Sequence, residues 1–228
     1  MTESIPPPHY IGHRERLRQK FWHARQSLTD YEILELFLFF SLPRRDTKPL
    51  AKKLLSKFET FENLAFADIE LLCSLEGVGP SVALAFSLYG EMQIRQAHQK
   101  VTQAPLLDSW DRVVTYCRLK EGFLSREIVH ALFLNAKNRL IANEVLAEGT
   151  VDQAPFYVRD IIKRALDLQA CSFILVHNHP SGDATPSAAD IEETRKLQQA
   201  AKIMGLTFYD HLIITRDRYT SLKNLGVL

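Results

Sequence analysis

The chain has 228 residues, of which 46% are hydrophobic and 24% charged, and its formal net charge is +1. This composition excludes a disordered chain and a fibrous repeat, and the length allows one large domain or two small ones. The longest apolar stretch, residues 33–42, is far shorter than the roughly 20 residues that cross a bilayer, so no transmembrane helix is expected.

The N-terminus contains three consecutive prolines and an acidic residue, Glu3, but no apolar core segment. This pattern does not resemble a secretory signal, so we expect a cytoplasmic protein with no membrane partner. The three cysteines, Cys73, Cys117 and Cys171, have no CxxC spacing. Neither a disulfide framework nor a thiolate zinc knuckle is therefore indicated, and we expect the cysteines to be buried.

Residues 13–96 show the three- and four-residue spacing of apolar side chains that is typical of helices. Thr29 and Asp30 supply N-cap chemistry for a helix that Pro43 ends. We therefore expect a small all-helical domain over residues 1–100. Further helices within it are predicted at residues 50–58, 67–74 and 82–92.

The segment 96–109 is polar, contains Pro105 and has no sustained period, which predicts a linker at residues 101–108. After it, apolar runs alternate with helical patterns, so residues 109–228 are predicted to form a mixed α/β domain. Asn135-Ala136-Lys137-Asn138 is turn chemistry for a hairpin. The predicted strands are 128–134, 140–146, 172–176 and 207–215, and the predicted helices are 158–168 and 188–204.

Two histidines, His177 and His179, follow a predicted apolar strand. Alternate residues of a strand share a face, so both ring nitrogens can bind one metal ion. Asp190 lies in the first turn of the next predicted helix and can supply a third ligand, which leaves a fourth position for water, as in catalytic zinc sites. These donors favour zinc, one ion per chain, with iron or manganese as alternatives.

Each of these residues also has an interpretation that needs no metal. Two histidines in an HxH pattern are often ordinary residues, and Pro180 and Gly182 are ordinary turn residues. Ser187 and Asp190 match a capping box at the start of the predicted helix. The metal interpretation is favoured because all these residues occur within 14 positions, at the end of one apolar strand.

The run His177-x-His179, seven residues, Ser187, two residues, Asp190 resembles the signature of the JAMM (JAB/MPN) zinc metalloproteases. The sequence HNHPSGDATPSAAD at residues 177–190 is similar to that of bacterial RadC proteins, long named DNA repair proteins. The resemblance implies a C-terminal JAB/MPN domain, a cytidine-deaminase-like mixed sheet flanked by helices, after a small all-α helix-hairpin-helix-like domain. Further matching segments extend it over nearly the whole chain: 12–17, 77–80 and 134–139.

The resemblance also implies roles for the matching residues. His177, His179 and Asp190 would bind the metal, and Ser187 would help to hold the oxyanion of a tetrahedral intermediate. The attacking group would be a metal-bound water, whose pKa zinc lowers to about 7.

An upstream glutamate is implied as well, which takes a proton from that water and passes it to the leaving amine. Glu127 is the first candidate because it opens the predicted strand 128–134, and Glu148 is the second. A solvated carboxylate at a strand end is the alternative interpretation of Glu127. Four more residues are candidates by type alone and are more typical of structural or solvated positions: His130, Cys171, Asp183 and His211.

The sequence Gly77-Val78-Gly79-Pro80, followed by a predicted helix, resembles the hairpin of helix-hairpin-helix DNA-binding domains. Gly77 and Gly79 would let the backbone approach a DNA phosphate, which the N–H groups at the helix start would bind. RadC-like hairpins usually continue with a lysine, whereas Ser81-Val82-Ala83 follows here. A glycine-terminated helix that leads into another helix is the alternative, and any DNA binding should be weak, non-specific and salt-dependent.

The sequence favours a zinc-dependent hydrolase that cleaves an amide, peptide or isopeptide bond in a protein or peptide substrate. The alternative is a DNA-associated repair or recombination accessory protein whose metal site is structural or inactive. A nuclease that uses the same metal is a weaker third hypothesis, because the sequence shows no second carboxylate-rich cluster for two-metal chemistry.

Overall fold

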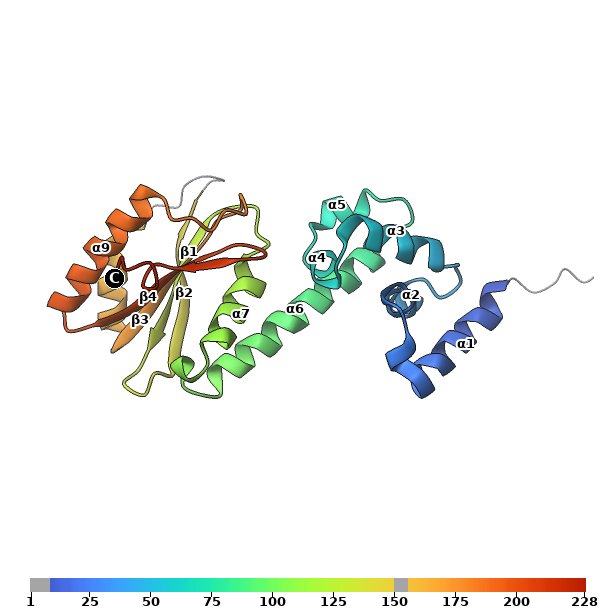
Figure 1. Ribbon diagram of the computed structural model, residues 1–228, viewed down its shortest axis with the longest axis horizontal. Coiled ribbons are helices and arrows are strands. Elements are labelled where there is room, and N and C mark those ends of the chain that lie inside the picture. The colour runs from blue at the N-terminus through green and yellow to red at the C-terminus, as the bar shows by residue number, and fades with distance from the viewer. Residues whose placement is uncertain (1–8, 150–155) are drawn as a thin grey trace, which may run out of the picture. The chain divides into compact units, whose positions relative to one another are not determined.

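A computed structural model describes residues 9–149 and 156–228 (Figure 1). The chain forms two compact units, Met1–Glu91 and Met92–Leu228, and the division lies within one long helix, α6 (Pro80–Thr102). The sequence instead predicts a linker at residues 101–108. That segment is packed, because Val101 and Leu106 are buried. Its polar composition reflects the exposed sides of the segment, which includes the end of α6 and a short 3-10 turn.

The N-terminal unit is all-helical, as predicted. Its apolar side chains, among them Leu38, Leu54, Leu72 and Phe86, pack into one core, so the helical spacing in the sequence reflects a shared interior. A 3-10 turn, Arg25–Ser27, follows the first helix. The helices are α1 (His9–Ala24), α2 (Asp30–Ser41), α3 (Lys48–Phe58), α4 (Phe61–Ala65), α5 (Ile69–Cys73) and the first part of α6.

The C-terminal unit contains a five-stranded mixed sheet with strand order β2-β1-β3-β4-β5. β1 pairs antiparallel with β2 and β3, whereas β3 pairs parallel with β4. Asn138, at the predicted hairpin turn, has a φ of 55°, a conformation that asparagine tolerates. The strands are β1 (Ile128–Leu134), β2 (Leu140–Glu148), β3 (Ser172–Asn178), β4 (Thr207–Ile214) and β5 (Tyr219–Ser221).

Helices cover both faces of this sheet (Figure 1). α8 (Val158–Asp167) and α9 (Ala188–Ile203) share a core with β1 and β3, whereas α7 (Trp110–Glu121) packs on the other face. A short 3-10 turn, Leu106–Asp108, precedes α7. α9 is the crossover between the parallel strands β3 and β4, so its first turn returns to the end of β3. This junction carries the predicted metal ligands.

The cysteines only partly follow the sequence-based expectation. Cys117 is buried, but Cys73 and Cys171 are exposed. Cys73 ends α5 and Cys171 precedes β3, so both lie at the edge of an element and outside a core. Among the described helices, none is long and apolar enough to cross a membrane.

Candidate metal centre

The candidate centre lies where β3 ends and α9 begins. His177 is the second-last residue of β3, and His179 comes directly after the strand. Ser187 caps α9, and Asp190 lies in the first turn of that helix. Glu127 immediately precedes β1, the antiparallel neighbour of β3. The side chains are withdrawn from solvent, since His177, Asp190 and Glu127 are 5%, 8% and 7% exposed.

Two carboxylates contact different ring nitrogens of His177. Asp190 Oδ1 lies 3.3 Å from His177 Nδ1, and Asp190 Oδ2 lies 3.7 Å from His179 Nε2. Glu127 Oε2 lies 3.4 Å from His177 Nε2. Within the described residues, the buried Nδ1 of His177 makes no hydrogen bond of good geometry. The imidazole therefore lies between two carboxylates, one facing each ring nitrogen.

One group of mutually close ligand atoms includes Glu127, which was not in the predicted set of ligands. One atom from each of Glu127, His177 and His179 lies within 4.8 Å of the other two. Asp190 contacts the two histidines through different oxygens, His177 through Oδ1 and His179 through Oδ2. The structure thus brings together all the residues that the sequence proposes as ligands, and it offers Glu127 beside Asp190 as a third donor.

The orientation of His179 suits metal binding. Its Nδ1 lies 2.8 Å from the backbone carbonyl of Asp183. A carbonyl only accepts hydrogen bonds, so Nδ1 carries the proton and Nε2 keeps its lone pair. Histidines that ligate metals almost always donate their other N–H in this way. The carboxylate of Asp183 accepts from Thr185 instead, so Asp183 supports the centre through its backbone.

The charges at the centre favour a cation. Burial alone would lower the pKa of His177, but the nearby carboxylate of Asp190, helped by that of Glu127, raises it above its ordinary value. Burial opposes ionisation of Asp190 too, yet the nearby His177 ring and two hydrogen bonds from Ser187 hold its pKa well below the usual range. The raised pKa of His177 means that the site favours a positive charge beside this carboxylate. A metal ion would supply such a charge, and its binding requires the neutral imidazole.

Ser187 and Asp190 form the capping box that the sequence offers as an alternative. The N–H and the hydroxyl of Ser187 both donate to Asp190 Oδ2 at 2.7 Å, and Asp190 N–H donates to the hydroxyl at 3.1 Å. The hydroxyl therefore orients the Asp190 carboxylate. To hold an oxyanion, it would have to turn away from that carboxylate.

The two glutamates considered for proton transfer have different surroundings. Glu127 is buried beside His177. The side chain of Glu148, near the end of β2, is 49% exposed and pairs with Arg126 at 3.0 Å. Of the two, Glu127 is the one that contacts a histidine of the centre.

Sequence reasoning missed the support that His211 and Thr194 give to the centre. His211 is fully buried, and its ring stacks on that of His177 at a centroid distance of 6.2 Å. Burial lowers the pKa of His211 to about 3, so it is neutral. Its Nδ1 donates to the Thr194 hydroxyl at 2.6 Å, and that hydroxyl donates to the Asp190 carbonyl at 2.5 Å. Only the register of β4 against β3 reveals this arrangement, since the histidine alone carries no signal.

His130 is not part of the centre. It lies on the opposite face of β1, where its Nδ1 contacts the buried carboxylate of Glu121 in α7. This contact links a helix to the sheet, in agreement with a structural histidine. Cys171 is exposed and takes no part in the group of ligand atoms described above.

The hairpin before α6 borders a hollow of about 360 Å³. Gly77 has a φ of 92°, which glycine adopts at low cost, and a Cβ on Gly79 would meet no atom within 4 Å. Arg45 reaches the hollow from the loop after α2, where Arg14 donates hydrogen bonds to the carbonyls of Leu42 and Arg45. The hollow is lined by Ser41, Leu42, Arg45 and residues 77–82.

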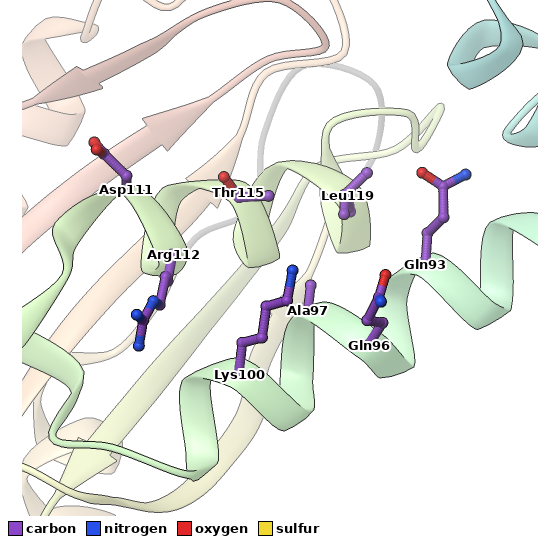
Figure 2. Close-up of a pocket in the computed structure, with 8 residues that line it drawn as sticks. All are labelled: Gln93, Gln96, Ala97, Lys100, Asp111, Arg112, Thr115 and Leu119. Atoms are coloured by element: carbon purple, nitrogen blue, oxygen red, sulfur yellow. The ribbon is translucent and has the colours of Figure 1, made fainter. Parts of the chain in front are cut away.

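A second hollow, of about 260 Å³, lies between α6 and α7 in the C-terminal unit (Figure 2). Lys100 extends from α6 toward α7, whereas Asp111 points away from α6 (Figure 2). The charged residues that line it are exposed, and none of the candidate site residues is among them. This hollow is therefore separate from the candidate centre.

Comparison with protein families agrees with this geometry. A family model described as RadC-like JAB domain matches residues 107–227, and a helix-hairpin-helix motif matches residues 60–89. The first match contains all the candidate metal ligands, and the second contains Gly77 and Gly79. The expected architecture is thereby confirmed: a helical region with a helix-hairpin-helix precedes a mixed sheet with flanking helices, consistent with a JAB/MPN fold.

Proposed function

Because the chain belongs to the RadC-like JAB domain family, we propose that it is a zinc-dependent hydrolase of the JAMM type that cleaves an amide, peptide or isopeptide bond. The observation that carries this proposal is the convergence of two histidines and two buried carboxylates at the end of β3. Such mixed histidine and carboxylate sets are typical of catalytic zinc, whereas structural zinc sites are mostly rich in cysteine.

The donor set fits zinc. His179 presents a free Nε2 because its other nitrogen donates to a carbonyl, and the buried Nδ1 of His177 lacks a hydrogen-bond partner of good geometry among the described residues. We assign His177, His179 and Asp190 as the residues that hold one ion. When bound, zinc lowers the pKa of water to about 7 and polarises a carbonyl group as a Lewis acid.

Glu127 is the proposed general base and acid. Its carboxylate is buried beside a proposed metal ligand, where it can accept a proton from the nucleophile and return it to the leaving amine. Ser187 is the proposed donor to the developing oxyanion, for which its hydroxyl would turn away from Asp190.

The test is cleavage of a panel of fluorogenic peptides and isopeptide-linked lysine peptides by the zinc-loaded full-length protein. At zinc concentrations that saturate each variant, Glu127→Gln should lose about 10²–10⁴-fold in activity, as expected for a lost general acid and base. Glu148→Gln is the matched control and should retain activity. The reverse result would make Glu148 the base, and a zinc-loaded protein that cleaves none of the panel would contradict the hydrolase proposal.

We further propose that the N-terminal unit binds DNA weakly and without sequence preference. The helix-hairpin-helix match and the hollow beside Gly79 favour this function. A phosphate in the hollow would meet N–H groups at the start of α6. Arg45, which lines the same hollow, would supply the positive charge that the hairpin itself lacks.

Fluorescence anisotropy of a labelled DNA duplex, titrated at several salt concentrations, tests this second function. Arg45→Gln should weaken binding and reduce the slope of log K against log salt by about one. Arg44→Gln is the control, since Arg44 is not among the residues that line the hollow. Equal losses in both variants would show that the hollow is not a phosphate site, and no binding at low salt would contradict the function itself.

A further inference from the structure

Asn178 stands between the two histidines of the centre and is 1% exposed. Its Oδ1 accepts a hydrogen bond from Ile128 N–H at 2.6 Å, and its Nδ2 donates to the Arg126 carbonyl at 3.0 Å. These two groups belong to the residues immediately before and after Glu127. One side chain from β3 therefore holds the backbone on both sides of the proposed general base.

The sheet itself shows why an asparagine is needed here. The backbone register between β1 and β3 runs from Leu134 to Val129, which pairs with His177. At Ile128, the residue before Val129, the backbone N–H donates to the side-chain amide of Asn178 and not to a backbone carbonyl. On the other side, Gly149 N–H donates to the Glu127 carbonyl at 2.9 Å. The backbone around Glu127 is thus held by Asn178 of β3 on one side and by Gly149, which follows β2, on the other.

We propose that Asn178 is the positioning residue for Glu127: its two hydrogen bonds fix the backbone from which the carboxylate reaches His177. This inference rests on the proposed function, because the role of Glu127 does. A primary amide is suited to the task, since one group accepts from an N–H while the other donates to a carbonyl. A carboxylate could not donate, and a hydroxyl is too short to serve both partners.

The alternative is that Asn178 merely satisfies buried backbone groups. The two roles differ in their coupling to Glu127, which a double-mutant cycle measures. The readout is the zinc Kd of the full-length protein, determined by competition with a chromophoric chelator. Glu127→Gln alone should weaken zinc binding by about ten-fold, as is typical for groups that support metal ligands.

In the Asn178→Ala background, the carboxylate has already lost its position. Glu127→Gln should then change the zinc Kd by less than about two-fold, so the two effects are not additive. A ten-fold effect of Glu127→Gln in both backgrounds would overturn the proposal.

Asn143→Ala is the matched control. Asn143 also lies on a strand of the sheet and donates to the Tyr116 hydroxyl at 2.6 Å, but it belongs to the face that packs against α7. Removing it should leave the effect of Glu127→Gln on zinc binding unchanged. If it weakens that effect as much as Asn178→Ala does, general loosening of the sheet explains both results and the proposal is wrong.

A crystal structure of zinc-free Asn178→Ser separates this inference from the proposed function. Serine keeps a small polar side chain at this position, but its hydroxyl is too short to replace the two hydrogen bonds of the amide. We expect Glu127 to leave contact with His177 in this variant and to keep it in the wild type. An unchanged contact would overturn the inference. A wild-type protein that binds no zinc would contradict the proposed function, and the zinc-free structures would still decide the role of Asn178.

Discussion

Replacing Ser187 with alanine should destabilise the C-terminal unit and release one side of Asp190. The serine hydroxyl accepts from Asp190 N–H at 3.1 Å and donates to Asp190 Oδ2 at 2.7 Å. Loss of an N-cap hydroxyl costs about 0.5–2 kcal/mol, and the carboxylate keeps its second donor, the Ser187 N–H. We therefore expect a loss of about 1–2 kcal/mol in the free energy of unfolding.

Differential scanning calorimetry of the zinc-free full-length protein measures this loss. For a unit of this size, 1 kcal/mol shifts the melting temperature by about 4 °C, so the expected decrease is about 4–8 °C. Thr29→Ala is the matched control, because the N–H and the hydroxyl of Thr29 both donate to Glu32 at the start of α2, at 2.8 and 3.0 Å. It should lower the transition of the N-terminal unit instead.

The two variants should differ in catalysis. A lost oxyanion donor lowers kcat by about 10²–10³-fold, so Ser187→Ala should be impaired to this extent on any substrate that the wild type cleaves. Thr29→Ala should retain the wild-type kcat. An unaltered kcat in Ser187→Ala would refute the oxyanion role, and an unaltered melting temperature would refute the capping argument.

Three further predictions concern packing, metal and pH. Gly90→Ala should cost about 1–3 kcal/mol in urea unfolding, because its Cβ would lie 2.8 Å from the Ala65 carbonyl oxygen, whereas Gly79→Ala, which meets nothing, should be nearly neutral. Zinc at 100 times its Kd should stabilise the metal-free protein by about 2.7 kcal/mol and EDTA should reverse this, so an unchanged melting temperature would disprove zinc binding. The hydrogen bond from Arg164 lowers the pKa of Glu144, so the stability from this pair is present above the unfolded pKa near 4.5 and is lost as the pH falls through the lower folded pKa. When the free energy of unfolding is measured against pH, Glu144→Gln should lack this loss at acid pH.

The first four strands of the C-terminal unit could be predicted because their residues are largely apolar and lie between clear turn signals. The three-residue strand β5 is too short to give a pattern and was not predicted. The helix α7 could not be predicted either. Its Val113-Val114-Thr115 run is β-branched and favours a strand locally. The helix is selected by burial of Val113 and Cys117 against the sheet and by the contact between Glu121 and His130. These contacts depend on the tertiary fold.

The candidate site also combines features that local sequence predicts with features that depend on tertiary contacts. The spacing of His177, His179 and Asp190 indicated a metal site, because strand and helix geometry alone brings these positions together. The place of Glu127 depends on the pairing of β1 with β3, and the roles of Asn178 and His211 depend on register as well. Register arises from contacts between distant segments, which residue spacing does not encode.

The central claim is that His177, His179 and Asp190 hold one zinc ion while Glu127 stays free for proton transfer. Its most direct test is the zinc content of the purified full-length protein after loading and gel filtration, for the wild type and for His177→Ala, Asp190→Ala and Glu127→Gln. We predict about one zinc ion per chain in the wild type and in Glu127→Gln, and none in the other two variants. Zinc retained by Asp190→Ala but lost from Glu127→Gln would make Glu127 the ligand, and a wild-type protein without zinc would contradict the metal centre altogether.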